Sequence, residues 1–480
     1  MKKKLYLTIA LLAAPAVCGA TTYWAAPGLA HETFTALIAD IEEQDGDIIY
    51  LQRGVTYAET LNIYANLDIR PFGTGAMPVI DATGLDWGAI IWNAKTCKIT
   101  GIEVKGSNAQ LLAIEAATLG VWQVDGVKVH SNLANPCITV SGSGWYVKNS
   151  EIYECANGGI FGINATAGLA ENNHIYDVVT NDSITLHDGT GTDNILRGNV
   201  TNGAPENEVD IQAGYTNTIV EDSDLSGSAQ YVFLNFGAGT ILRRTRLHDS
   251  ARGAYTAAQM ISHHNYFYNL DDATYGSLGG ISGFYFTGAA DGSSSLNDTF
   301  KTSNQATGRP VIYAETGADN LAIENDIFDV NKAQRTLQFV DAAPVGLVCD
   351  CNSYNSVHTV LAQTAAVTYA NLAAWQVAGQ DANSDGSEQY LDTQGRPTAK
   401  TPATIKRGGV LLDGYASIAG KYGYIGAYPY YEGTITPWNI ALSIMGGPGR
   451  LGGGTVYNAP MELVTFGGES ATFGGETATW

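Results

Sequence analysis

Basic residues are scarce in this 480-residue chain, which has 25 Lys and Arg against 47 Asp and Glu and a net charge of -22. Such an acidic chain is disfavoured as a partner of nucleic acid, which selects basic surfaces. Beyond residue 20 the sequence has no apolar stretch long enough to cross a bilayer, so we expect no membrane span.

Cysteine is also rare, with six residues of which Cys18 lies in the first twenty. The other five are Cys97, Cys137, Cys155, Cys349 and Cys351, an odd number that leaves at least one thiol unpaired within the chain. Free core cysteines are the interpretation we favour. Cys349 and Cys351 have no second Cys/His pair at zinc spacing, so no metal is assigned to them.

The first twenty residues have the layout of a secretory signal peptide. Lys2, Lys3 and Lys4 precede an apolar run from Leu5 to Val17, and small residues end the segment at Ala20. We therefore expect a secreted or cell-surface product, in the bacterial periplasm or outside the cell, or on a virion if the chain is phage-encoded.

A repeat dominates the rest of the chain. Eleven segments, starting between 20 and 33 residues apart, follow the pattern apolar-x-x-x-small polar-x-apolar. Periods in this range indicate stacked one-dimensional units. The small polar position is taken in turn by Thr100, Asp125, Ser150, Asn173, Asn199, Ser223, Thr245, Asn265, Asp298, Asn325 and Asn352.

The alternation of β-branched and aromatic residues within each unit predicts short strands whose alternate side chains enter a shared core. Each unit buries its apolar face only by stacking, and the polar positions then form a hydrogen-bonded ladder. We predict an all-β fold, a right-handed parallel β-helix of about 11 or more coils. The apolar spacing from Phe34 to Glu43 predicts an amphipathic helix that caps its N-terminal end.

Several segments resemble secreted parallel β-helix proteins, both polysaccharide lyase-like and tailspike-like. Gly46–Leu51, Thr56–Leu61 and Ile69–Gly73 resemble their opening coils, and Tyr424–Tyr428 resembles a closing coil. The resemblance covers roughly residues 22–430 and implies the fold, but one scaffold hosts many activities. The expected organisation is a signal peptide at 1–20, an N-terminal cap and first coils at 21–95, the central β-helix at 96–380, a C-terminal coil and cap at 381–445, and a Gly-rich tail at 446–480.

The strongest candidate for chemistry is an acidic segment. Alternation around Val209 and Ile211 turns Glu208 and Asp210 outward, beside Glu206. The preceding coil offers His187 and Asp188 as catalytic candidates, and the next offers Tyr231, Phe233 and Asn235 as outward, substrate-binding positions. Together they predict a shallow acidic groove with an aromatic edge, a combination typical of sugar-binding clefts.

Two reactions would use this groove. Hard oxygen ligands from Glu206, Glu208 and Asp210 suit Ca²⁺, which assists lyases acting on uronate polymers, and the layout resembles that of calcium-assisted polysaccharide lyases. Their Lys-Ser and Leu-Arg-His-Gly strings are absent. Alternatively, Asp188 and Asp210 would act as acid and base in a glycoside hydrolase. We favour the lyase.

A basic strand lies nearby in sequence. Arg244, Arg246 and His248 are predicted to face outward, with Arg246 catalytic and the other two binding substrate in the same groove. The alternative class is a phage tailspike or adhesin that binds glycans without cleaving them. The protein would be a monomer, or a homotrimer if tailspike-like.

Overall fold

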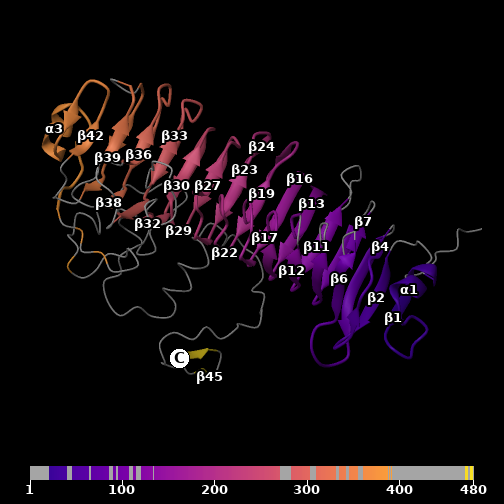
Figure 1. The fold of residues 1–480 in the computed structure, drawn as a ribbon. Helices are drawn as coiled ribbons and strands as arrows, with labels where there is room; N and C mark the ends of the chain where they lie inside the picture. The colour runs from indigo at the N-terminus through magenta and orange to yellow at the C-terminus, as the bar shows by residue number, and fades with distance from the viewer. Residues whose placement is uncertain are drawn as a thin grey trace, which may run out of the picture. The chain divides into compact units, whose positions relative to one another are not determined.

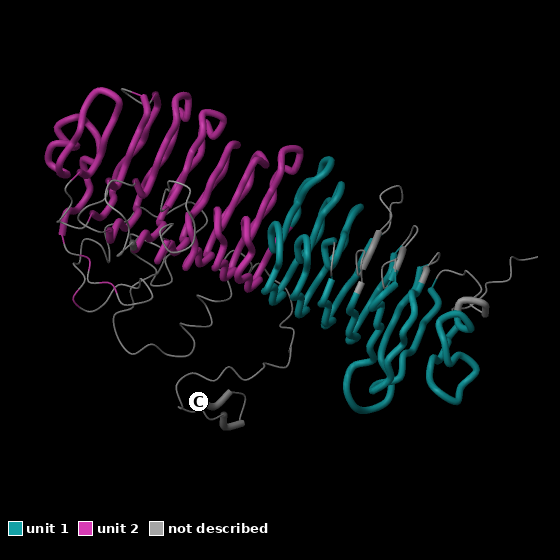
Figure 2. Tube along the Cα trace, viewed as in Figure 1, with its two compact units in different colours: residues 1–194 teal, residues 195–480 magenta. Residues whose placement is uncertain are grey.

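The structure is a computed structural model. It describes residues 21–40, 46–63, 66–85, 90–92, 96–107, 112–114, 121–132, 135–270, 283–302, 310–330, 335–341, 345–354, 360–387, 389, 391, 400, 471–473 and 476–478. The predicted signal peptide and the predicted closing coil around Tyr424–Tyr428 lie outside these residues. The chain forms two compact units, residues 1–194 and 195–480, coloured separately in Figure 2.

Both units are built from the same three parallel sheets, here called A, B and C, and the chain visits them in that order in successive coils (Figure 1). In unit 1, sheet A contains β1 (Thr22–Ala25), β2 (Asp47–Gln52), β5 (Leu67–Phe72), β8 (Thr96–Thr100), β11 (Val121–Asp125), β14 (Tyr146–Lys148) and β17 (Leu169–Glu171). Sheet B contains β3 (Thr56–Tyr57), β6 (Val79–Leu85), β9 (Glu103–Ser107), β12 (Lys128–Asn132), β15 (Glu151–Cys155) and β18 (His174–Tyr176). Sheet C contains β4 (Leu61–Ile63), β7 (Ile90–Trp92), β10 (Leu112–Ile114), β13 (Ile138–Ser143), β16 (Ile160–Thr166) and β19 (Ile184–Leu186), and the short β20 (Gly191–Thr192) follows.

Unit 2 repeats the arrangement. Its sheet A contains β21 (Ile195–Arg197), β25 (Ile219–Glu221), β28 (Thr240–Arg243), β31 (Met260–His263), β34 (Ser294–Leu296), β37 (Ala322–Glu324) and β40 (Val348–Asp350). Sheet B contains β22 (Val200–Asn202), β26 (Asp224–Ser226), β29 (Arg246–Ser250), β32 (Tyr266–Leu270), β35 (Thr299–Thr302), β38 (Ile327–Val330) and β41 (Ser353–Tyr354). Sheet C contains β23 (Val209–Ile211), β27 (Tyr231–Asn235), β30 (Arg252–Thr256), β33 (Phe284–Phe286), β36 (Pro310–Ala314), β39 (Arg335–Phe339), β42 (Val360–Gln363) and β43 (Thr368–Tyr369), the last antiparallel; β24 (Tyr215–Thr216) is a short strand after β23.

These ladders confirm the predicted parallel β-helix and its stack of at least nine coils. Successive side chains of a strand point to opposite faces of the sheet. Equivalent positions in successive coils therefore point into the interior together, and similar residues occupy them. In sheet B of unit 2, the buried rings of Phe267, Phe300, Phe328 and Tyr354 stack with centroids 4.8–5.1 Å apart. The aromatic positions of the repeat are therefore core positions.

The predicted polar ladder lies at the corner between sheets A and B. In unit 1, the Asn173 side chain accepts a hydrogen bond from the Ser150 N–H (3.1 Å) and donates to the Val147 carbonyl (2.8 Å). Residues just before this position take a left-handed conformation, with φ of 50° at Asn149 and 55° at Asn172. Asn tolerates this conformation better than most residues, which explains its frequency here.

The ladder register predicted from sequence is wrong in three coils. Neighbouring strands of sheet B pair Val104 with Val129, and Val129 with Ile152. The corner residue lies two positions before each of these, at Ile102, Val127 and Ser150. Thr100 and Asp125 instead end β8 and β11 and are half-buried. In unit 2 the ladder residue is Asp326 and not Asn325, because Phe300 pairs with Phe328.

Helices α1 and α3 flank the strands in the described part of the chain. Helix α1 (Phe34–Asp40) packs buried Phe34 against Tyr57 in unit 1, and its capping role stays a prediction. Helix α3 (Leu372–Val377) in unit 2 was not predicted. Its Trp375 donates to Asp381, which also accepts from Tyr354.

Two smaller features complete the description. Cys137 and Cys155 form a disulfide in unit 1, which corrects the expectation of free core cysteines, whereas Cys97, Cys349 and Cys351 are free. In the predicted tail, β44 (Ala471–Phe473) and β45 (Glu476–Ala478) pair antiparallel with one another.

Candidate functional site

The predicted acidic segment forms β23, in sheet C of unit 2. Val209 and Ile211 point into the core as predicted, with at most 1% of their surface exposed. Asp210 is nevertheless only 5% exposed and accepts a hydrogen bond from the Gln212 side chain at 2.5 Å. Glu208 is fully buried and accepts the Ala204 N–H at 3.0 Å. These two acids are covered and do not form an open acidic wall.

The predicted calcium ligands therefore differ in exposure and in the contacts that they already make. Glu206 is exposed, whereas one oxygen of buried Glu208 is already bound to the main chain. Within the described part of the chain, no group of three or more His, Cys, Asp or Glu side chains is arranged to hold a metal ion. Calcium binding by Glu206, Glu208 and Asp210 stays a prediction.

Two of the predicted substrate-binding residues point inward. Phe233 pairs with core residue Val209 and Asn235 with Ile211, and both side chains are fully buried. Asn235 is held inside by Thr256 (3.0 Å) and by Thr240. The outward position between them is Leu234, in register with Asp210. We therefore do not retain Phe233 and Asn235 as contacts for a ligand.

A row of tyrosines occupies the outer face of sheet C in unit 2. Tyr255, Tyr285 and Tyr313 are in register on β30, β33 and β36, one after another from Leu234. Neighbouring ring centroids are 4.9 and 5.1 Å apart, and Tyr231 lies 5.2 Å from Tyr255. Each side chain is half-buried. We call Tyr231, Tyr255, Tyr285 and Tyr313 the tyrosine row.

One carboxylate influences the whole row. Glu315 follows β36, accepts a hydrogen bond from the Tyr285 hydroxyl, and has a half-buried side chain. Burial raises the pKa of Tyr255, Tyr285 and Tyr313, and the charge of Glu315 raises each of them further. These phenols are neutral near pH 7, and the Tyr285 hydroxyl donates a hydrogen bond to Glu315.

A guanidinium lies at the Tyr231 end of the row. Arg252 donates to the Tyr231 hydroxyl at 2.9 Å, and its guanidinium carbon is 4.9 Å from the centroid of that ring. Burial raises the pKa of Tyr231, while Arg252 lowers it in part. The row therefore combines aromatic surface with the buried guanidinium of Arg252 and the carboxylate of Glu315. On β39, which follows β36 in sheet C, the half-buried Arg335 donates a hydrogen bond to Gln338, which is in register with Tyr313.

The predicted residues Arg246 and His248 lie on another sheet. Both belong to β29 of sheet B, whereas Asp210 belongs to β23 of sheet C, so they do not share one sheet face. His248 contacts Asp224 (2.5 Å) and Asp249 (2.6 Å) through its two ring nitrogens. Its ring stacks on the ring of Tyr268, and the Tyr268 hydroxyl accepts a hydrogen bond from Arg246 at 3.1 Å. This arrangement corrects the expectation of a common groove.

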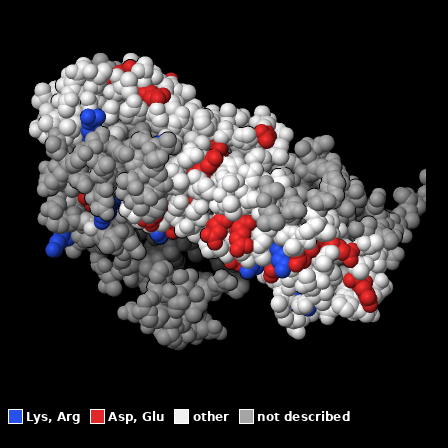
Figure 3. All heavy atoms as spheres, in the orientation of Figure 1, with Lys and Arg blue, Asp and Glu red and all other residues white. Residues whose placement is uncertain are grey.

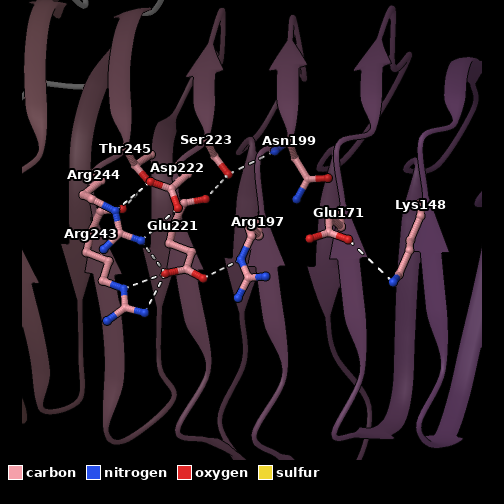
Figure 4. Close-up of polar contacts among 10 residues, drawn as sticks. All are labelled: Lys148, Glu171, Arg197, Asn199, Glu221, Asp222, Ser223, Arg243, Arg244 and Thr245. Carbon is pink, nitrogen blue, oxygen red and sulfur yellow. Dashed lines mark hydrogen bonds and ion pairs between the residues drawn. The ribbon is translucent and has the colours of Figure 1, made fainter. Parts of the chain in front are cut away.

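Arg244 is part of a satisfied ion network on sheet A and the adjoining corner of unit 2 (Figure 4). It binds Asp222 through two nitrogens, at 2.7 and 2.8 Å, and contacts Glu221 at 2.7 Å. Arg197 and Arg243 each contact the same Glu221, at 2.6 Å. Burial raises the pKa of Glu221, but the three guanidinium groups outweigh it and the net pKa is lowered. Three cations around one buried carboxylate indicate a structural role for Arg244.

The predicted residues His187 and Asp188 follow β19 in sheet C of unit 1. Asp188 is 63% exposed and lies 2.7 Å from the His187 ring. Because Asp210 belongs to unit 2, the predicted pair of Asp188 and Asp210 combines separately described units and stays a prediction.

Sequence reasoning missed most of the tyrosine row. The signal was present as a Tyr between two core residues in Ala254-Tyr255-Thr256, Phe284-Tyr285-Phe286 and Ile312-Tyr313-Ala314. The repeat pattern did not extend to sheet C, so these strands were not aligned.

Acidic side chains are prominent and basic ones few on the face drawn in Figure 3, in keeping with the net charge of -22. No helix in the described segments has the length and apolar character needed to cross a membrane.

No family model and no curated protein sequence matches this chain. Solved structures similar to it include a GH136 lacto-N-biosidase from Eubacterium ramulus, with 10% identity, TM-score 0.41, and coverage of 68% of this chain and 65% of that one. The chain thus spans about two thirds of the length of that protein. Others are a PL6 alginate lyase in complex with a trisaccharide (12% identity, TM-score 0.48, coverage 85% and 94%) and the Dettilon tailspike protein (12% identity, TM-score 0.39, coverage 65% and 64%).

Proposed function

We propose that the protein is a carbohydrate-active β-helix protein that binds a polysaccharide along the tyrosine row of unit 2. The observation that carries this proposal is the repetition of half-buried tyrosine rings about one strand apart on one sheet face. An aromatic ring offers an apolar surface to the C–H face of a sugar, and the phenol offers a hydrogen bond at its edge. Repetition at successive coils suits a linear chain of sugars.

Cleavage of a uronate polymer by a lyase is the reaction we favour. A guanidinium beside the row would neutralise a uronate carboxylate, because it pairs bidentately with that group; Arg335 on β39 is half-buried, whereas Arg252 is only 9% exposed. The acid that protonates the departing oxygen would be a group other than Tyr285, whose hydroxyl already donates to Glu315. The base that takes the proton beside the carboxylate is not assigned.

Hydrolysis by Asp210 and Glu315 as a pair is disfavoured. Asp210 lies on β23 and Glu315 directly follows β36, and these two strands are four steps apart in sheet C. At about 4.8 Å per strand this is roughly 19 Å. Paired carboxylates of glycoside hydrolases are about 5–10 Å apart.

Binding without cleavage is the second candidate, and one observation favours it. Every phenol of the tyrosine row has a raised pKa, so none is prepared to act as a base near neutral pH. A tailspike or adhesin needs only the binding surface. The predicted monomer, or homotrimer in the tailspike case, is distinguished by measuring the mass in solution.

Export is also part of the proposal. The disulfide between Cys137 and Cys155 favours an oxidising compartment, and the lysine-rich, apolar first twenty residues favour secretion.

The test combines binding and turnover. The protein without residues 1–20 is incubated with uronate and neutral polysaccharides, and binding, unsaturated ends by ultraviolet absorbance, and reducing ends are measured separately. Loss of the ring in Tyr255→Ala should weaken binding roughly threefold to tenfold, since such contacts contribute about 0.5–1.5 kcal/mol. Tyr268→Ala, on sheet B, is the matched control. Unchanged binding by Tyr255→Ala would refute the proposal, and unsaturated ends would decide between lyase and binding protein.

A further inference from the structure

A carboxylate occupies a core position in the first strands of unit 1. Asp47 begins β2, and its side chain is fully buried. The strand register places Leu67 beside it on β5, and then Cys97 and Trp122 on the next two strands of sheet A. These three neighbours are buried apolar residues. Asp47 therefore brings a carboxylate into a column of apolar side chains.

The contacts of Asp47 satisfy this carboxylate only in part. Its Oδ1 accepts a hydrogen bond from the Thr21 N–H at 2.8 Å, while its Oδ2 has no hydrogen-bond partner among the residues that the structure describes. Burying a carboxylate costs free energy unless a cation or several donors compensate for the lost water, and Asp is rarely buried without such a partner. The nitrogen that reaches Asp47 belongs to the first residue after the predicted signal peptide.

We infer that the signal peptide is cleaved between Ala20 and Thr21 and that the α-ammonium group formed at Thr21 binds Asp47. This deepens the proposed export and rests on it. A signal peptidase adds water across the peptide bond, so that Ala20 leaves as a carboxylic acid and Thr21 keeps the nitrogen as an amine. Near pH 7 the acid gives up a proton and the amine takes one up. The Thr21 nitrogen then carries three protons and a positive charge in place of one amide proton.

The main chain holds this nitrogen in place. Thr22 of β1 pairs with Ile48 of β2, and the Ile48 N–H donates to the Thr21 carbonyl at 2.9 Å (Figure 1). These contacts fix Thr21 opposite Asp47. Cleavage at an earlier bond would leave a neutral amide at this position, and cleavage at a later bond would remove the nitrogen. The buried carboxylate therefore selects one start for the mature chain, where the sequence alone indicates only the region of cleavage.

The first part of the test locates the start of the mature chain. The full chain, including residues 1–20, is produced in a bacterium, and the exported protein is analysed by mass spectrometry. The inference expects the mass of residues 21–480.

The second part measures the ion pair. Urea unfolding is followed near pH 6, where an α-amine is protonated, for a chain that starts at Thr21 and for one that starts at Gly19. Each chain is also prepared with Asp47→Asn, and with Asp81→Asn as the matched control. Asp81 is half-buried on β6 and likewise accepts a main-chain N–H, at 3.0 Å, but it lies on sheet B.

We expect the equilibrium constant for folding to be about tenfold lower for the chain that starts at Gly19, because a hydrogen bond between two charged groups is stronger than one from a neutral amide. Asp47→Asn should remove this difference, and Asp81→Asn should preserve it. A difference below about twofold, or an equal difference with Asp47→Asn, would overturn the inference. If Asp47→Asn does not fold, the two wild-type chains decide the question by themselves.

Failure of the inference differs from failure of the proposed export. If the protein keeps residues 1–20 and stays inside the cell, the proposed export is wrong and the inference falls with it. If the exported protein begins at a residue other than Thr21, export stands and the inference is wrong.

Discussion

Two buried carboxyl groups in the corner ladder of unit 2 make the stability of the protein depend on pH. Asp298 and Asp326 are both fully buried. The Ser295 hydroxyl lies 3.0 Å from an oxygen of Asp298 and 2.7 Å from an oxygen of Asp326. This hydroxyl has one proton and donates to one of them, so the other contact is a hydrogen bond only if that carboxyl group is protonated.

The electrostatics agree with a shared proton. Burial raises the pKa of Asp298 to about 7, against the hydrogen bonds donated by Ser262, Asn265 and Ser295. Burial raises the pKa of Asp326 well above its ordinary range, and the charge of Asp298 adds to this effect. The charge of Glu324 raises the pKa of Asp326 further.

The perturbation is Asp298→Asn, and its magnitude follows from the pKa of Asp298. A raised pKa means that the folded state holds the proton more tightly, so the free energy of unfolding falls as pH rises from about 4 to about 7. A rise from 3.8 to about 7 corresponds to about 4 kcal/mol at most. The free energy of unfolding of the variant does not fall in this way. Its difference from the wild-type value should therefore grow by about 2–4 kcal/mol in favour of the variant between pH 4 and pH 8.

The asparagine should fit without rearrangement of the corner. Asn265 and Asn352 occupy equivalent ladder positions, where each side-chain amide donates to a main-chain carbonyl, at 2.9 and 2.8 Å. In Asp298→Asn, the new amide would meet the hydroxyl oxygens of Ser262 and Ser295, which can both accept.

The assay is urea unfolding of the full chain followed by tryptophan fluorescence, from about pH 4 to about pH 8. Asp291→Asn is the control, because Asp291 is an exposed carboxylate of the same unit. The double variant with Asp326→Asn should show the flattest pH profile. If Asp298→Asn follows the wild-type profile at every pH, the two carboxyl groups are not linked to folding and the reasoning is wrong.

Three further predictions concern the ladder, the basic strand and calcium. Asn265→Ala should lower the free energy of unfolding by about 2–3 kcal/mol, because it removes the acceptor of the Thr245 N–H and leaves buried groups unpaired. Urea unfolding measures this change, and a loss below about 0.5 kcal/mol would contradict it. Arg246→Ala should change polysaccharide binding less than twofold, about 0.4 kcal/mol, because its sheet differs from that of the tyrosine row, and selective loss of uronate binding would contradict the assignment. If Glu208 and Asp210 bind Ca²⁺, added calcium should raise the melting temperature of the wild type. It should not raise that of the variant in which both carboxylates are changed to amides. An unchanged melting temperature of the wild type would exclude this site.

The sequence alone determined the architecture. The repeat of small polar residues followed by apolar ones at a period of 20–33 residues has few solutions, because each unit buries its apolar face only against its neighbours. The inward direction of Val209 and Ile211 was predicted correctly from the alternation of side chains along a strand. The corner register was wrong where Thr100, Asp125 and Asn325 matched the pattern by chance.

Tertiary structure decided what lies on which face. Coils differ in length, so neighbours in the stack are set by strand register, and a shift of one residue turns every side chain to the other face. Phe233 and Asn235 thus became core residues, while Tyr255, Tyr285 and Tyr313 came into line from coils whose sequences show no common spacing. The surroundings of Glu221 were equally invisible in the sequence, since the guanidinium groups of Arg197, Arg243 and Arg244 reach it from the coils before and after it. The sequence fixes the period of a solenoid, but only the stacked chain determines which side chains meet.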